Sequence, residues 1–330
     1  MLPELADLLS STRVVSLPLT ARFRGITVRE AVLFEGPQGW TEFSPFVEYG
    51  DTEAAAWLHA AIDFGWRPAP TPLRDRIPVN ATVPAVAAGR VAAVLDRYPG
   101  ARTAKVKVAE PGQTLADDVA RVREVREYLG PEGRIRIDAN TLWNVDEAEH
   151  AIHALAPYDL EYVEQPCATV EELAEIRGRV AYMGVPIAAD ESVRKAEDPL
   201  AVAKAGAADL LIVKAQPLGG IHAALRIVGE AGLPVVVSSA IDTSVGIAMG
   251  AHLAAAVPSL EFDCGLGTVA MFEQDVADEP LLPVGGSIPV VRPTVSTARL
   301  DALAADAERR DWWIDRIRRC YRVVERAAAL

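Results

Sequence analysis

The sequence predicts an α/β protein in which a TIM-type (β/α)7-8 barrel is joined to an α+β capping domain. Two observations lead to this prediction. Strand-like and alanine-rich helical segments alternate over about 190 residues, which is the pattern of a parallel barrel. Proline-rich passages bound this repeat, so the N-terminal region and the C-terminal segment are expected to form the capping domain. An open doubly wound sheet is the alternative, but no glycine-rich dinucleotide-binding turn follows the first strand.

Residues 1–77 are expected to form the α+β capping domain. Apolar alternation predicts short strands at 14–17, 26–34 and 39–43. A helix is expected over 51–62, with Asp51 or Thr52 as its N-cap. Four prolines between positions 68 and 78 then prevent any regular element, which places a domain boundary there.

Residues 78–270 carry the repeat and are expected to form the barrel with the active site. Residues 271–330 open with a second proline-rich passage and end in an amphipathic helix over 310–327. We expect this segment to pack on the capping domain or on the barrel. Helices are expected over 85–98, 115–129 and 145–155, and strands over 79–83, 103–108, 134–138, 160–164, 186–190, 210–214, 234–239 and 260–264.

The charge balance excludes some classes of partner. Lysine and arginine number 33 against 46 aspartates and glutamates, which gives a net charge of −13. We expect neither nucleic acid nor an anionic membrane as a partner, although a local cluster of lysines still allows a small-molecule carboxylate substrate. Three well-separated cysteines, no cationic leader and no long apolar span favour a cytoplasmic protein. The sequence does not determine the oligomeric state and is compatible with a monomer.

Charged residues recur at the carboxyl ends of five successive barrel strands. In a parallel barrel these ends converge on one mouth, where functional residues gather. A single acidic residue in this position usually caps the next helix, and a lone Lys-Val-Lys strand is usually a solvated edge. Three acids in succession with lysines on both sides instead indicate a catalytic site. The five residues, separated by 31, 26, 26 and 24 positions, are Lys107, Asp138, Glu164, Asp190 and Lys214.

These residue types predict a metal-assisted proton transfer. Three converging carboxylates suit a hard divalent cation such as Mg²⁺, which would also relieve their mutual repulsion. Lys105 and Lys107 share one face of their strand because they are two residues apart. Burial and neighbouring cations lower the pKa of such lysines, so that they can transfer protons. The chemistry we expect is abstraction of a proton α to a carboxylate, with the enediolate held on the metal.

Five motifs resemble those of the enolase superfamily, and more narrowly those of its muconate-lactonizing-enzyme subgroup. The resemblance covers residues 78–270, and the N-terminal region fits the family's capping domain less specifically. The short chain, Ser238-Ser239 and the turn Cys264-Gly265-Leu266-Gly267-Thr268 are most similar to members that eliminate water. The motifs are Lys105-Val106-Lys107, Asp138-Ala139-Asn140, Val163-Glu164-Gln165-Pro166, Ala189-Asp190-Glu191-Ser192 and Val213-Lys214.

The resemblance implies a hydro-lyase reaction, the syn dehydration of a succinyl-bearing hydroxycyclohexadiene carboxylate to an aromatic product. Lys107 would remove the α-proton and then protonate the departing hydroxyl. Lys214 would stabilise the enediolate from the opposite side, partly by cation–π attraction, and Lys105 would keep the pKa of Lys107 low. The implied metal is Mg²⁺, with Mn²⁺ as a substitute, and its implied ligands are Asp138, Glu164 and Asp190. Asn140 would support these ligands without binding the metal itself.

Several further residues are open to two interpretations. Arg24 lies on a segment that resembles the family's capping loop, where it would meet a substrate carboxylate or remain solvated. Gly219-Gly220 precedes a helix and would bind an anion there, although turn chemistry explains the pair as well. Four residues lie where a succinyl carboxylate would meet hydroxyls and backbone N–H groups, or are only turn residues: Ser238, Ser239, Gly265 and Gly267.

Two alternative functions stay open. Family members that racemise N-succinylamino acids or epimerise dipeptides share these lysines and metal ligands. From a different class, the barrel could be a non-catalytic binding protein. That alternative predicts decay of the lysine and carboxylate set, whereas all six of its members are present in this sequence.

Overall fold

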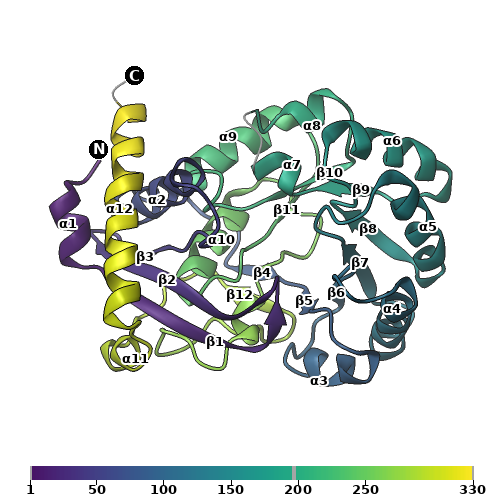
Figure 1. Ribbon diagram of the computed structural model, residues 1–330, viewed down its shortest axis with the longest axis horizontal. Helices are drawn as coiled ribbons and strands as arrows, with labels where there is room; N and C mark the ends of the chain where they lie inside the picture. The colour runs from purple at the N-terminus through teal and green to yellow at the C-terminus, as the bar shows by residue number, and fades with distance from the viewer. Residues whose placement is uncertain (1, 195–197, 329–330) are drawn as a thin grey trace.

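A three-stranded antiparallel sheet forms the centre of the capping domain (Figure 1). The computed structural model of the protein describes residues 2–194 and 198–328. Within the capping domain lie α1 (Leu5–Ser10), β1 (Arg13–Phe23), β2 (Ile26–Gly36), β3 (Gly39–Phe43) and α2 (Asp51–Trp66). Strands β1 and β2 are longer than predicted. They pair with each other from Arg13 and Leu33 at one end to Phe23 and Ile26 at the other, beyond the apolar residues on which the prediction rested. Helix α2 begins after the N-cap Gly50, so the predicted N-cap at Asp51 or Thr52 is wrong.

Parallel strands follow and form the barrel. They are β5 (Ala81–Val83), β6 (Thr103–Lys107), β7 (Arg134–Asp138), β8 (Leu160–Glu164), β9 (Ile187–Ala189), β10 (Leu210–Val213) and β11 (Val235–Val237). They are hydrogen-bonded in the order β11-β10-β9-β8-β7-β6-β5. All four residues of β10 are buried, as expected for a parallel strand that is covered on both faces.

Two short bridges close the barrel where an eighth strand was expected at 260–264. Cys264 pairs with Val79, just before β5, and Gly265 pairs with Ser238, just after β11. The backbone of residues 264–265 therefore joins the two ends of the curved sheet. The fold class predicted from the sequence is confirmed, with seven regular strands and one that is reduced to these bridges.

Helices cover the outside of the barrel (Figure 1). The expected helix over 85–98 is broken into the 3-10 turn η1 (Ala88–Arg90) and α3 (Val91–Leu95), whereas α4 (Leu115–Leu129) and α5 (Val145–Leu155) match the prediction. Capping boxes at Thr114, Asn144 and Thr169 start three of these helices. The later helices are α6 (Val170–Val180), α7 (Glu191–Arg194), α8 (Ala201–Lys204), α9 (Ile221–Ala231) and α10 (Ser244–Ala256), with 3-10 turns η2 (Ala156–Tyr158), η3 (Ala181–Met183) and η4 (Thr268–Met271).

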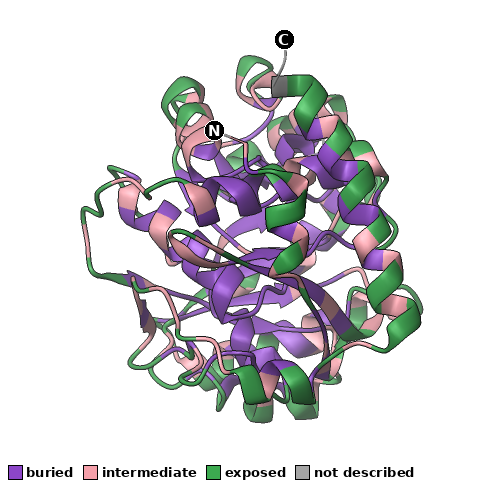
Figure 2. Ribbon diagram, turned by 90° about the vertical axis from the view of Figure 1, so that its left-hand side faces the viewer, coloured by how far each residue is buried: buried purple, intermediate pink, exposed green. Residues whose placement is uncertain are grey.

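The C-terminal segment returns to the capping domain. Its strand β12 (Ser287–Pro289) pairs with β4 (Arg76–Pro78), and α11 (Thr297–Ala302) and α12 (Ala307–Ala328) follow. Helix α12 packs against α2, and Trp313 and Ile317 are buried in the same apolar cluster as the capping sheet. Figure 2 shows α12 with buried residues along one side and exposed residues along the other.

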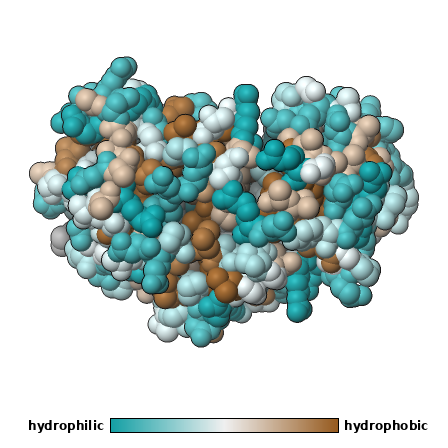
Figure 3. All heavy atoms as spheres, turned by 90° about the horizontal axis from the view of Figure 1, so that it is seen from below, coloured by the Kyte–Doolittle hydropathy of each residue, from teal (hydrophilic) through white to brown (hydrophobic). Residues whose placement is uncertain are grey.

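Most of the surface seen from below is hydrophilic, and apolar atoms gather there in a short band near the middle (Figure 3). Across residues 2–194 and 198–328, no helix is both long enough and apolar enough to cross a membrane.

Candidate active site

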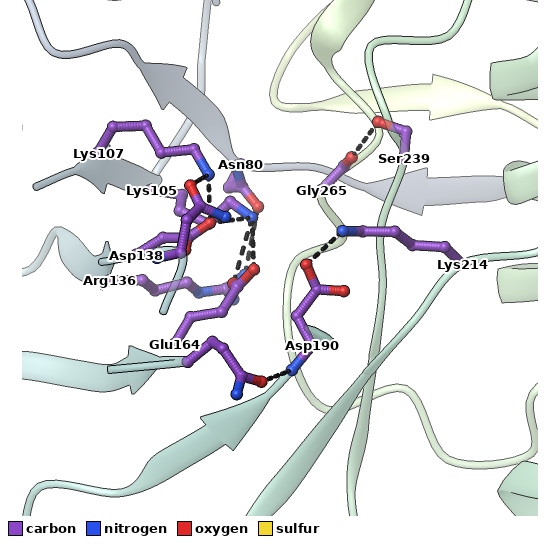
Figure 4. A network of polar contacts seen from close by, with 12 residues as sticks. Asn80, Lys105, Lys107, Arg136, Asp138, Glu164, Asp190, Lys214, Ser239 and Gly265 are labelled. Atoms are coloured by element: carbon purple, nitrogen blue, oxygen red, sulfur yellow. Dashed lines mark hydrogen bonds and ion pairs between the residues drawn. The ribbon is translucent and has the colours of Figure 1, made fainter. Parts of the chain in front are cut away.

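The carboxyl ends of the barrel strands bring the predicted charged residues together. Parallel pairing aligns Lys107 of β6 with Asp138 of β7, and Asp138 with Glu164 of β8. Asp190 directly follows β9 and Lys214 directly follows β10. Figure 4 shows the lysine pair on one side of the barrel mouth and Lys214 on the opposite side. The two sets of ammonium groups therefore face each other, with the carboxylates between them.

The lysine pair is bound to two of the three carboxylates. Lys105 Nζ lies 3.0 and 3.2 Å from the Glu164 oxygens and 3.4 Å from Asp138 Oδ2. Lys107 Nζ donates to Asp138 Oδ2 and, over 2.6 Å, to Asn140 Oδ1. Lys105 is buried together with both acids, and the Lys107 side chain is 12% exposed. Lys107 thus has an amide oxygen as well as a carboxylate within reach of its amine.

The third carboxylate is bound from the other side. Asp190 Oδ2 accepts from Lys214 Nζ over 2.5 Å. Its other oxygen, Oδ1, lies 3.3 Å from Arg194 Nε but accepts no hydrogen bond. The backbone N–H of Asp190 donates to Gln165 Oε1 over 2.8 Å, which fixes the start of α7. Asp190 therefore retains one buried oxygen whose hydrogen-bonding capacity is unused.

The two paired lysines differ in acidity although they share one strand face. Burial lowers the pKa of Lys107, and the charge of Lys105 lowers it further, against the attraction of Asp138. Burial acts on Lys105 in the same direction, but Glu164 and Asp138 outweigh it and raise the pKa of Lys105. Lys107 is consequently the member of the pair that can lose its proton more readily.

The carboxylates differ as well. Burial and the charge of Asp138 raise the pKa of Glu164 to about 7. Burial also opposes ionisation of Asp138, but Lys107 and Lys105 overcome it and hold its pKa far below the usual range. For Asp190 burial is again outweighed, by Lys214 and Arg194, and its pKa is lowered to about 2. Of the three acids, Glu164 is therefore the one whose ionisation this site disfavours.

The donor set fits a hard divalent cation in its chemistry. The three carboxylates Asp138, Glu164 and Asp190 are buried and lie on successive strand ends, and oxygen ligands are those that Mg²⁺ prefers. Among the described residues no three acidic, histidine or cysteine side chains surround a single point as they stand. Lysine ammonium groups pair with the carboxylates instead. The raised pKa of Glu164 favours an added positive charge, and Asp190 Oδ1 is a buried oxygen that accepts no hydrogen bond.

A small pocket lies at this mouth. Its lining includes most of the residues that the sequence singled out. It also includes Thr82, Ile241 and Thr268, which the sequence did not single out individually as pocket residues. The predicted residues in the lining are Arg24, Lys105, Lys107, Asp138, Asn140, Asp190, Lys214, Ser238, Ser239 and Gly265.

The serine and glycine residues occupy different positions around this pocket. Ser239 Oγ donates to Gly265 O over 2.8 Å and lies 3.0 Å from Thr268 Oγ1. A side chain at Gly265 would collide with the Ser238 hydroxyl, so glycine is required for the close approach of the two strand ends. Gly267 does not belong to the pocket lining and packs against Asn80 and Tyr98 instead, which favours its role as a turn residue.

The capping loop reaches the same mouth. Arg24 and Gly25 have φ values of 48° and 79°, which makes the tight turn between β1 and β2. The Phe23 ring lies 5.2 Å from Lys107 Nζ, and the Arg24 guanidinium lies 4.5 Å from the Phe46 ring. Arg24 therefore lines the pocket, and its guanidinium is stacked on an aromatic ring.

The anion site considered at Gly219-Gly220 is filled by the protein itself. Asp63 of α2 lies at the start of α9, where its Oδ2 accepts from His222 N over 3.4 Å. A side chain at Gly220 would collide with the same carboxylate. The two glycines lie where α2 of the capping domain meets α9 of the barrel. Neither of them lines the pocket at the barrel mouth.

Comparisons with known proteins extend these observations. Residues 87–294 match the family described as enolase C-terminal domain-like, and residues 14–65 match enolase N-terminal domain-like. The o-succinylbenzoate synthase of Mycolicibacterium smegmatis is 58% identical over 323 residues, covering 98% of each chain. Proteins of the same name are 58% identical in Mycobacterium tuberculosis H37Rv, covering 97% of each chain, and 56% identical in Mycobacterium ulcerans, covering 98% of this chain and 97% of that one.

Solved structures show the same fold at lower identity. A muconate lactonizing enzyme of Pseudomonas fluorescens has a TM-score of 0.76 at 20% identity, covering 89% of this chain and 98% of that one. The L-Ala-D/L-Glu epimerase of Bacillus subtilis has a TM-score of 0.73 at 24% identity, covering 86% and 96%. The chain belongs to the enolase superfamily and, within it, to the o-succinylbenzoate synthase family.

Proposed function

We propose that the chain is a hydro-lyase with o-succinylbenzoate synthase activity. It would convert 2-succinyl-6-hydroxy-2,4-cyclohexadiene-1-carboxylate into 2-succinylbenzoate and water, a reaction of menaquinone biosynthesis. The observation that carries this function is the 58% identity with o-succinylbenzoate synthases over nearly the whole of both chains. The reaction is a small-molecule dehydration, for which we expect a cytoplasmic enzyme that needs no nucleic acid or membrane.

Lys107 is the proposed acid and base. Its lowered pKa favours the neutral amine, which would take the proton from the carbon next to the substrate carboxylate. The resulting ammonium would return that proton to the hydroxyl on the adjacent carbon, so that the C–O bond breaks and water leaves. The same group acts on one face of the ring, which gives a syn elimination. Asn140 Oδ1, 2.6 Å from Nζ, would orient the amine between the two steps.

Lys214 and Lys105 have proposed electrostatic roles. Lys214 faces Lys107 across the pocket (Figure 4) and would stabilise the negative charge that develops on the carboxylate during proton removal. Its pairing with Asp190 fixes the ammonium at the pocket wall. Lys105 would remain charged, because Glu164 and Asp138 hold its proton, and its charge keeps the neighbouring Lys107 acidic.

The three carboxylates are the proposed Mg²⁺ ligands, with Mn²⁺ as a substitute. When bound, the cation would supply a Lewis acid next to the substrate carboxylate. Glu164 supports this assignment best, because a buried acid with a pKa raised to about 7 gains most from a nearby cation. In a binding experiment followed by calorimetry, Glu164→Gln should weaken Mg²⁺ affinity by at least tenfold.

The succinyl end of the substrate is proposed to lie on the side of the mouth away from Lys107. Ser238 and Ser239 offer hydroxyls there, and Gly265 lets the Ser238 hydroxyl lie close to its backbone at the pocket wall. Arg24 of the capping loop would meet a substrate carboxylate from above the pocket. Gly267 keeps the neighbouring turn in place without contacting the ligand.

An activity assay of the purified chain tests this function. The expected result is Mg²⁺-dependent loss of the cyclohexadiene substrate and appearance of 2-succinylbenzoate, abolished by EDTA. Racemisation of an N-succinylamino acid or epimerisation of a dipeptide without dehydration would instead assign the chain to those activities. Ligand binding without turnover of any of the three substrates would favour a binding protein.

A further inference from the structure

We propose that Arg29, supported by Glu42, is a positioning residue for the substrate pocket. From the capping domain, the two side chains hold barrel residues 239–243 in the conformation that receives the far carboxylate of the substrate. The identity of that substrate rests on the proposed function. The restraint of residues 239–243 by Arg29 and Glu42, called the clamp below, rests on the contacts between the two domains.

The clamped segment has an unfavourable backbone conformation. Ser239, Ala240 and Ile241 line the pocket, and Ile241 has a φ of 61° while being 2% exposed. A β-branched residue in the left-handed region is strained and persists only when its surroundings enforce that conformation. Something must therefore hold this part of the pocket wall in place.

Arg29 provides that restraint. Its guanidinium is 2% exposed and donates from Nε to Ile241 O over 3.2 Å. A second nitrogen, Nη2, donates to Ser44 O of the capping domain. The same group stacks 4.3 Å from the centre of the Phe46 ring. One planar guanidinium thus joins the carbonyl of the strained residue to a carbonyl beyond β3, a geometry that a lysine cannot reproduce.

Glu42 of β3 holds the next residues. Its Oε2 accepts from Thr243 N over 3.1 Å, from Thr243 Oγ1 over 2.5 Å and from Gly246 N over 3.0 Å. Its Oε1 accepts from Ser44 Oγ over 2.6 Å. A carboxylate of the capping domain therefore binds the N-terminus of the barrel helix α10, whose N-cap Thr243 lies two residues after the strained Ile241.

Charged groups from both domains meet around the clamped segment. Arg29 faces two buried carboxylates, Glu42 and Asp242, while Arg24 also acts on Arg29 and Lys214 on Asp242. Asp242 Oδ1 accepts from Ala240 N over 3.3 Å, so its carboxylate is also attached to the clamped segment. Loss of the guanidinium would leave carbonyl and carboxylate groups of the pocket wall without their shared partner.

The test compares Arg29→Lys with a matched control, Arg74→Lys. Arg74 also joins a region outside the barrel to α10, through Ala254 O at 2.6 Å and Val257 O at 2.7 Å, but at the end of the helix remote from the pocket. Lysine retains the charge in both variants and removes the bridging geometry. We expect Arg29→Lys to raise KM for the cyclohexadiene substrate about tenfold with kcat within about threefold, and Arg74→Lys to change neither.

Hydrogen exchange over residues 239–246 gives a second readout that does not depend on activity. We expect faster exchange of these amides in Arg29→Lys and wild-type exchange in Arg74→Lys. In an Ile241→Gly background, where positive φ carries no strain, Arg29→Lys should raise KM less than threefold.

Equal KM and equal exchange in the two lysine variants would overturn the proposal, as would a fall in kcat at unchanged KM in Arg29→Lys. A wild-type chain that does not dehydrate the cyclohexadiene substrate would disprove the proposed function. The exchange measurement would still test whether Arg29 restrains residues 239–243. Unchanged exchange in Arg29→Lys would overturn this role, and faster exchange would support it.

Discussion

The two walls of the pocket are held in different ways. The Lys107 wall, made of β6 and β7 with Lys105 and Lys107, is supported from within the barrel. Arg121 of α4 donates to Lys107 O over 2.8 Å, and Asp118 accepts from Ala109 N over 2.9 Å. These partners lie only 14 and 9 residues from the groups they bind.

The Lys214 wall, made of Lys214 and residues 238–241, is supported from the capping domain. Ser44 N donates to Gln216 Oε1 across 172 residues of sequence, and Arg29 reaches Ile241 across 212. The wall that carries the proposed proton transfer is therefore built locally, and the wall that would recognise the substrate depends on how two domains meet. Four predictions test this division, from the largest expected effect to the smallest.

The largest effect is expected at the Lys107 wall itself. Lys107→Ala removes the proposed acid and base, and kcat for dehydration should fall by about 10⁴-fold. The fold and Mg²⁺ binding should remain, because the three carboxylates are unchanged and Lys105 still balances the charge of Asp138 and Glu164. Steady-state kinetics and calorimetry check the two parts. Substantial residual activity in this variant would remove Lys107 from its role.

A smaller loss is expected at the Lys214 wall. Lys214→Ala removes a charge that stabilises the transition state without transferring a proton, so kcat should fall by about 10² to 10³-fold. Lys214→Arg keeps the positive charge beside Asp190 and should recover part of the loss. An alanine variant as inactive as Lys107→Ala, with no recovery by arginine, would mean that both lysines move protons.

The same division explains what could be predicted from the sequence. Lys107, Asp138 and Glu164 were found because strand periodicity places each at a strand end, and the barrel brings strand ends together. The helices α4 and α5 were predicted at their full lengths, and capping boxes within the same segments begin them in the structure. These signals are local, and so is the support of the Lys107 wall.

Arg29 and Ile241 were missed because no local pattern identifies them. Arg29 lies on a strand among exposed residues such as Val28, and nothing near it in sequence indicates a partner 212 residues away. Ile241 adopts a positive φ in which isoleucine is disfavoured, so its own identity argues against the observed conformation. Both depend on contact between domains, which a pass along the chain does not show.

Support of the Lys107 wall can be weakened without touching its lysines. Arg121→Lys should lower kcat about tenfold with KM nearly unchanged, because the carbonyl of Lys107 loses a buried partner and the amine shifts. Arg126→Lys is the matched control on the same helix, since Arg126 binds Gly133 O and Tyr158 O away from the pocket. Equal kinetics in the two variants would contradict local support of this wall.

The smallest effect concerns stability at the domain joint that holds the Lys214 wall. Burial and the charge of Asp242 raise the pKa of Glu42 from 4.5 to about 7. Between these values the folded chain binds more protons than the unfolded chain, so the free energy of unfolding should fall as the pH rises and level off above about 7. In denaturant titrations between pH 5 and 8, the free energy of unfolding of Glu42→Gln should decline by about 1 to 3 kcal/mol less than that of the wild type.

Glu30 provides a control of opposite sign in the same domain. Burial acts against its ionisation, but hydrogen bonds from Arg309 and Trp313 overcome this and lower its pKa. Glu30 therefore stabilises the fold above its unfolded pKa, and Glu30→Gln should destabilise the chain at neutral pH and lose this effect in acid. If stability declined as steeply between pH 5 and 8 in Glu42→Gln as in the wild type, the joint would carry no burial cost at Glu42. The dependence of the Lys214 wall on the capping domain would then rest on the contacts of Arg29 and Ser44.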